Sequence, residues 1–176
     1  MDILISSNLE RLLYLTAGQE RTAKYMEALN TEGSYKADAD VMERINESFI
    51  GICADESATL SEIQRVMKEK NYLIDTHTAV ASYAARVYTD TYKAERKVLI
   101  ASTASAYKFA KDALCAIAPS EACGISDTEA LEMLSAITRT EIPTPLAGIC
   151  KKTILHSEII GKDEMNEAVI GFACDQ

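Results

Sequence analysis

The sequence lacks long apolar runs and an excess of basic residues. No apolar run approaches the roughly 18 residues of a membrane-spanning helix, and the first residues, Met1-Asp2, lack the basic region of a signal peptide. We therefore expect no membrane span, no signal peptide and a cytoplasmic location. Lys and Arg total 18 against 27 Asp and Glu, a net charge of −9. This charge repels nucleic-acid phosphates and anionic lipids, so we expect neither as a partner.

Histidine is scarce, and cysteine is scattered along the chain. With only His77 and His156, the sequence offers no cluster of the kind that binds zinc, and we expect no metal site. The five cysteines contain no C-x-x-C pair, which without a secretion signal indicates reduced, mostly buried thiols. The G-x-G-x-x-G, Walker and G-x-S-x-G motifs are absent. No common catalytic motif therefore identifies an activity.

The composition is that of a globular protein. The chain has 176 residues, of which 48% are apolar and 26% charged, close to the averages of soluble domains. This length fits one domain and leaves little room for two. We therefore expect residues 1–176 to form a single globular domain.

Amphipathic patterns predict seven or so helices. Apolar residues recur at helical spacing in each of these segments, and glycine or proline follows several of them. Three segments open with a capping box, in which Ser or Thr and a Glu three residues later satisfy free amides: Ser7–Glu10, Thr59–Glu62 and Ser126–Glu129. The predicted helices cover about 7–17, 19–29, 38–49, 59–67, 75–87, 107–117, 126–137 and 162–172.

Short apolar runs predict two or three buried strands. The clearest is Lys97–Ala101, since it is short, apolar and preceded by charged residues. Asp2–Ser6 is a second, and Thr153–His156 is a possible third. The predicted fold class is therefore α/β, a helix-rich, partial three-layer unit with a short, mainly parallel sheet. Such sheets normally have four or more strands, so this one looks incomplete.

Small hydroxyl-bearing residues follow the predicted strands. Ser102, Thr103 and Ser105 lie between a strand and a helix, the position where α/β proteins bind ligands. The alternative is that they only turn the chain and cap the helix. His77, at another predicted helix start, is either a proton carrier or ligand contact, or a simple cap residue. Lys108 and Lys111 are expected to be solvated surface lysines.

Three runs of the sequence match one known family. They are Asp2-Ile3-Leu4-Ile5-Ser6-Ser7-Asn8-Leu9-Glu10-Arg11-Leu12-Leu13-Tyr14, Asp75-Thr76-His77-Thr78-Ala79-Val80-Ala81 and Ile100-Ala101-Ser102-Thr103-Ala104-Ser105-Ala106-Tyr107-Lys108-Phe109. The family's ending is also similar to Leu155–Glu158 followed by Lys162–Met165. By these segments the sequence resembles threonine synthase, a pyridoxal-phosphate enzyme of the tryptophan-synthase-β-like fold (fold type II). The first and third runs are specific, whereas the second run and the ending are weak.

The resemblance implies that the chain is the C-terminal part of a longer enzyme. The family's Schiff-base lysine and its glycine-rich phosphate loop then lie outside this chain, which leaves no catalytic residue in it. Phe109–Asp112 imitates the family's Phe-Lys-Asp lysine motif but is one residue too long. By the resemblance, the hydroxyl of Thr103 hydrogen-bonds the pyridine nitrogen of the cofactor, while Ser102 and Ser105 shape that corner.

Two further positions are marked by the resemblance. His77 and Thr78 match a motif near the family's active-site region, without an assigned role. Ala106 replaces a usual proline, which loosens the turn that positions Thr103.

The activity implied is conversion of O-phospho-L-homoserine and water to L-threonine and phosphate with pyridoxal phosphate as electron sink. We expect the isolated chain to be inactive, not to bind the cofactor at a specific site, and to self-associate through apolar strand edges. The alternatives are another pyridoxal-phosphate lyase of the same fold and a noncatalytic helical interaction module.

Overall fold

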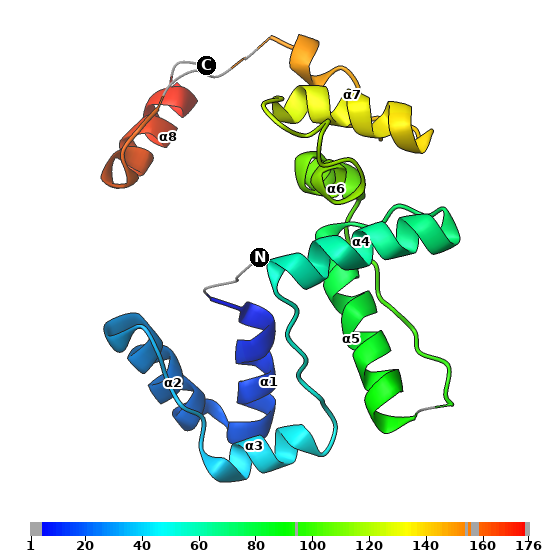
Figure 1. The fold of residues 1–176 in the computed structure, drawn as a ribbon. Helices are drawn as coiled ribbons and strands as arrows, with labels where there is room; N and C mark the ends of the chain where they lie inside the picture. The colour runs from blue at the N-terminus through cyan, green and yellow to red at the C-terminus, as the bar shows by residue number, and fades with distance from the viewer. Residues whose placement is uncertain (1–4, 94, 154, 156–158, 175–176) are drawn as a thin grey trace. The chain divides into compact units, whose positions relative to one another are not determined.

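The structure is a computed structural model that describes residues 5–93, 95–153, 155 and 159–174. It divides into two compact units, Met1–Thr140 and Glu141–Gln176. Figure 1 shows the helices of each unit. The first unit contains α1 (Ser7–Ala17), α2 (Gln19–Glu32), α3 (Ala39–Asn46), α4 (Glu56–Lys70), α5 (Thr76–Tyr92), the 3-10 helix η1 (Ala106–Phe109), α6 (Ala110–Ile117) and α7 (Asp127–Thr138). The second contains η2 (Ile149–Lys151), η3 (Lys162–Glu164) and α8 (Met165–Cys174).

The predicted sheet is wrong, because the described residues form helices and loops and no strand. The segment 98–101 is apolar as expected but lies exposed, with Leu99 at 96% relative exposure. A strand exists only when its backbone pairs with a neighbour. The backbone hydrogen bonds of the described residues include none made by residues 98–101. Although these residues are apolar, they therefore form no sheet with another described segment.

The other two predicted strands lie partly outside the described residues. Of Asp2–Ser6, only Ile5 and Ser6 are described; Ile5 is exposed, and Ser6 caps α1. Of Thr153–His156, only residues 153 and 155 are described, and neither is in a strand. With no sheet, there is also no common sheet edge for Ser102–Ser105 and Ser6–Asn8, which the strand predictions would require.

Helices α1, α2 and α3 pack on a small core of Leu13, Tyr25 and Val41. These residues face one another because apolar positions recur on one side of each helix. The Tyr25 hydroxyl donates to Asp38 Oδ2 at 2.7 Å. Arg21 binds both carboxylate oxygens of Asp40 at 2.9 Å. The apolar core thus joins all three helices, and these polar bonds add contacts between α2 and the start of α3.

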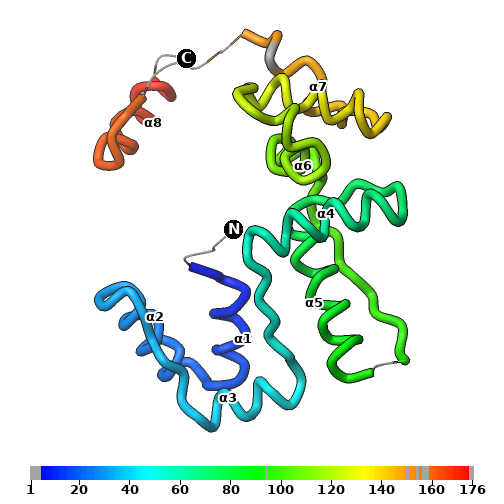
Figure 2. Tube along the Cα trace, in the orientation of Figure 1, coloured from blue at the N-terminus to red at the C-terminus, as the bar shows by residue number. Residues whose placement is uncertain are grey.

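Helices α4 to α7 pack in sequence, α4 on α5 and α6, and α6 on α7. Ile63, Ile74, Ala79 and Ala116 form a core cluster between α4, α5 and α6. The segment after α5 runs back along that helix, as the tube in Figure 2 shows. This return brings Ser102 beside the first turn of α5.

A buried carboxylate fastens α4 to α5. Glu62 of α4 is 1% exposed and accepts from Ser82 Oγ of α5 at 2.7 Å. Arg65 donates to it from the same helix at 2.6 Å, and Arg86 contacts it from α5 at 3.3 Å. These hydrogen bonds and charges satisfy a group that could not otherwise be buried.

One of the three capping boxes is confirmed. Ser126 and Glu129 make both reciprocal bonds at the start of α7. The other two boxes are wrong because a competing acceptor lies earlier in the chain. Ser6 rather than Ser7 caps α1, and Asp55 rather than Thr59 caps α4.

The predicted burial of the thiols is also wrong. Among the cysteines whose side chains are described, Cys53, Cys123 and Cys174 are exposed, and Cys115 is half-buried; all are free. The described helices include none that is both long enough and apolar enough to cross a membrane.

Candidate functional site

Asp75 organises the start of α5. The run Asp75–Thr78 places a carboxylate at the N-cap, where it accepts from the free amides of the first turn. Its Oδ1 accepts from His77 N at 2.8 Å and from Thr78 N at 3.3 Å, and its side chain is fully buried. Burial acts to raise the pKa of this carboxyl, but hydrogen bonds from the Thr78 hydroxyl and the two amides outweigh it. The pKa of Asp75 therefore lies below its usual value, and the group is ionised at neutral pH.

A chain of hydroxyls connects Asp75 to the loop before η1. Thr78 Oγ1 donates to Asp75 Oδ2 and lies 2.9 Å from Ser102 Oγ. Thr78 has one hydroxyl hydrogen, and the ionised carboxylate can only accept it. Ser102 must therefore donate to Thr78. This chain of bonds fixes the loop to α5, although Thr78 and Ser102 are 24 positions apart in the sequence.

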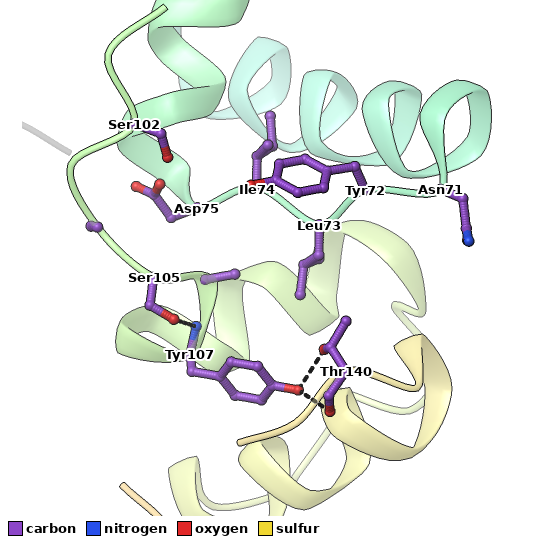
Figure 3. A pocket seen from close by; sticks show the side chains of 11 residues that line it. Asn71, Tyr72, Leu73, Ile74, Asp75, Ser102, Ser105, Tyr107 and Thr140 are labelled. Carbon is purple, nitrogen blue, oxygen red and sulfur yellow. Dashed lines mark hydrogen bonds between the residues drawn. The ribbon is translucent and has the colours of Figure 1, made fainter. Parts of the chain in front are cut away.

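A hollow of about 220 Å³ lies beside these residues (Figure 3). Asp75 and Ser102 lie on its upper side in the figure. Ser105 lies below them beside Tyr107, whose hydroxyl bonds Thr140 O at 2.9 Å on the lower side. Ser105 Oγ accepts from Tyr107 N at 3.2 Å and so caps η1. The other lining residues are Asn71, Tyr72, Leu73, Ile74, Ala104 and Ala106.

The structure brings together three of the predicted site residues. Ser102 bonds Thr78, and both Ser102 and Ser105 belong to the loop at the hollow. Thr103 lies between them but is exposed and does not line the hollow. Ala106, expected to loosen the turn, is 7% exposed at the start of η1. The roles predicted for these residues stay predictions.

His77 lies at the same helix start but points elsewhere. Its Nδ1 is 3.3 Å from Asp75 Oδ1, and its ring lies 5.6 Å from the Phe109 ring. Nδ1 and the nearby Thr76 Oγ1 are buried polar atoms without a hydrogen-bond partner in the part of the chain that the structure describes. His77 thus contacts η1 rather than the hollow.

Sequence reasoning missed Asp75, Tyr107 and Thr140 as parts of this site. Asp75 carried a signal, since it opens a run of cap-forming residues. Tyr107 could only be assigned to a helix face. Thr140 is 33 positions from Tyr107 and reaches it through the packing of α6 on α7, which no local pattern reveals.

The residues that line this hollow do not fit a whole pyridoxal phosphate molecule. An exposed hydroxyl such as that of Thr103 can donate to a ring nitrogen. The hollow is lined by no lysine or arginine, and its one charged residue, Asp75, would repel a phosphate group. The hollow therefore offers no cation for the phosphate and no amine for the reactive aldehyde.

Lys108 and Lys111, which follow the loop, make contacts outside the hollow. Lys111 Nζ donates to the carbonyl oxygen of Ile125 at 3.0 Å, and Lys108 Nζ lies 5.3 Å from the centre of the Phe109 ring. Both residues are exposed, as the sequence predicted. The structure describes no group of three or more His, Cys, Asp or Glu that could bind a metal ion.

Comparison with known proteins confirms the sequence resemblance. The chain is 33% identical over 113 residues to human threonine synthase-like 1 and 32% identical over 127 residues to threonine synthase of Saccharomyces cerevisiae, in each case across 62% of this chain. It spans 15% and 24% of the lengths of these two relatives. No family model matches the sequence.

Two solved structures have a similar fold. The crystal structure of yeast threonine synthase matches 87% of this chain with a TM-score of 0.66 at 24% identity. The crystal structure of PLP-bound threonine synthase from Brucella melitensis matches 87% with a TM-score of 0.60, also at 24% identity. The chain covers 31% and 29% of these two structures, so the similarity concerns a part of each.

Proposed function

From the relationship to threonine synthases, which extends over about 62% of the chain, we propose that this chain is the C-terminal part of a threonine synthase. The complete enzyme would convert O-phospho-L-homoserine and water to L-threonine and phosphate. The observation that carries the proposal is the loop 102–105, which carries the family resemblance and is fixed to α5 by the bond between Ser102 and Thr78.

In this proposal the loop forms one wall of a cofactor site. Thr103 would donate to the pyridine nitrogen, and the anchor at Ser102 would hold that hydroxyl in place. Ser105 would keep η1 in register by accepting from Tyr107 N. Pyridoxal phosphate, when bound, supplies an electron sink for elimination of phosphate from the substrate. A neutral hydroxyl at the ring nitrogen would make that sink milder than an aspartate would.

The isolated chain is expected to be inactive. A cofactor of this class reacts through a lysine amine, and the hollow beside the loop has none. The remaining groups, a phosphate-binding loop and the reactive lysine, would come from additional polypeptide. This chain would therefore supply residues that position the cofactor, and not the lysine that reacts with it.

A hybrid enzyme tests the proposal. Residues 1–176 would replace the matching segment of yeast threonine synthase, and release of phosphate from O-phospho-L-homoserine would be measured. We expect a measurable turnover that falls about a hundredfold in Thr103→Val and largely returns in Thr103→Ser, because only the hydroxyl is required. Thr31→Val, which removes an exposed hydroxyl of α2, should leave turnover unchanged.

Two results would reject the proposal. A folded hybrid that binds the cofactor but releases no phosphate, while dehydrating serine or threonine, would favour another lyase of the same fold. A folded hybrid that neither binds the cofactor nor turns over substrate would favour a noncatalytic helical module.

A further inference from the structure

An uncharged hollow beside α5 is lined by two extended segments of the chain. It has a volume of about 320 Å³ and is separate from the candidate site. Ile50 and Ile52, from the loop between α3 and α4, belong to its wall, and so does the segment 98–101. None of the ten lining residues is charged, so another apolar surface can pack here. Helix α5 contributes small side chains and one tyrosine: Ala81, Ala84, Ala85 and Tyr88.

Both extended segments offer unused backbone hydrogen-bonding groups. Residues 50–53 and 98–101 lie in no helix or strand, and the backbone hydrogen bonds of the described residues include none made by either segment. Figure 2 shows both as drawn-out stretches of the tube. Ile50 is 53% exposed and Leu99 is 96% exposed. Exposed, apolar backbone of this kind pairs readily with a strand of another polypeptide.

We propose that this hollow binds an extended, apolar segment of the polypeptide that completes a threonine synthase. The bound segment pairs its backbone with residues 98–101 on one edge and with residues 50–53 on the other. An extended segment directs every second side chain to one face, and the small alanines of α5 leave room for these side chains. The inference rests on the proposed function, to which it adds the place where the additional polypeptide binds.

The lengths of the related structures support this occupant. The chain covers 31% of the yeast threonine synthase structure and 29% of the Brucella melitensis structure, so more than two thirds of each lies outside the part that it matches. A polypeptide of that size can also contact exposed apolar side chains elsewhere, such as Leu9 and Leu15 of α1. The ten residues at the hollow therefore need not alone supply the roughly 20 residues per partner of a stable interface.

A second copy of the chain fits this hollow less well. In each copy, residues 50–53 and 98–101 border that copy's own hollow, so either segment would have to leave α5 to enter another. Two copies with a charge of −9 also repel each other. The self-association expected from the sequence is therefore the competing outcome of the test.

Co-purification tests the proposal. Yeast threonine synthase that lacks the segment matched by this chain is tagged and co-expressed with the full chain, and the amount of chain that co-purifies is measured. Ala84→Trp is the disruptive variant because its large side chain fills the hollow. Ala23→Trp, at an exposed position of α2, is the matched control. We expect wild type and Ala23→Trp to co-purify equally, and Ala84→Trp about tenfold less. Far-ultraviolet circular dichroism of the isolated variants establishes that both keep their helices.

Amide hydrogen exchange locates the contact. In the co-purified complex, the amides of residues 50–53 and 98–101 should exchange about tenfold more slowly than in the isolated chain, because they become hydrogen-bonded. Failure to co-purify, or a complex in which these amides exchange as in the isolated chain, would overturn the proposal. So would an isolated chain that sediments as a dimer dissociated by Ala84→Trp, because a second copy would then occupy the hollow.

The proposed function and this inference can fail separately. In the hybrid enzyme described above, slow exchange at residues 50–53 and 98–101 without phosphate release would support the inference and reject the proposed function. Phosphate release by a hybrid in which these amides exchange as fast as in the isolated chain would support the function and reject the inference.

Discussion

At the scale of single residues, Glu62 is the clearest determinant of stability. The Arg65 guanidinium, outweighing the opposite effect of burial and helped by Ser82 and Arg86, lowers the pKa of this carboxyl from 4.5 to about 2. A depressed pKa stabilises the folded state at pH values above the unfolded pKa. That stability is lost as the pH falls from about 4.5 to 2.

Replacing Glu62 by Gln should destabilise the chain by about 2 to 3 kcal/mol at pH 7, because two arginines and Ser82 lose their ionised partner. Urea denaturation followed by circular dichroism measures this change. Glu69→Gln is the control, since Glu69 also pairs with Arg65 but is half exposed; it should change stability by less than about 0.5 kcal/mol. The difference between wild type and Glu62→Gln should shrink between pH 4.5 and pH 3. A difference that is constant over that range would contradict this account of Glu62.

Part of the candidate site could be predicted from sequence. Ser102, Ser105 and Thr78 are short polar residues next to apolar segments, and this local signal correctly placed them near a helix start. Their connection to Asp75 could not be predicted, because it depends on the path by which the chain returns along α5. The partner of Tyr107 could not be predicted either, because Thr140 reaches it through the packing of α6 on α7.

At the scale of elements, helices were predictable and strands were not. A helix satisfies its own backbone, so the apolar spacing of Ile63 and Val66 or of Leu131 and Leu134 is enough to indicate one. The segment 98–101 has the composition of a strand, but a strand requires a second segment at hydrogen-bonding distance. Composition alone cannot supply that partner.

Helix starts provide a direct test at this scale. Ser6→Ala should destabilise the chain by about 1 kcal/mol, since Ser6 Oγ accepts from Leu9 N. Ser7→Ala should have almost no effect, although Ser7 fits the capping-box pattern. Asp55→Ala and Thr59→Ala form a second such pair at α4. Thermal unfolding of the four variants measures these changes, and a larger loss in Ser7→Ala than in Ser6→Ala would place the cap one residue later.

At the scale of the whole molecule, the chain represents only part of its relatives. It covers 31% of the yeast crystal structure whose fold it matches. The described residues fold into helices around small cores, and the hollow beside the loop 102–105 lacks a cation for a phosphate group. A complete cofactor site is therefore not expected in this chain alone.

This view predicts how the isolated chain reacts with pyridoxal phosphate. A specific site needs a lysine amine held near bound phosphate. The two lysines that follow the loop in η1 and α6, Lys108 and Lys111, are exposed and directed at Phe109 and Ile125. Reaction should therefore spread over the surface amines in proportion to their exposure. Borohydride reduction followed by peptide mass analysis should find low labelling at many lysines, unchanged in Thr103→Val. A single lysine labelled stoichiometrically, with labelling that Thr103→Val reduces, would instead mean that these 176 residues bind the whole cofactor.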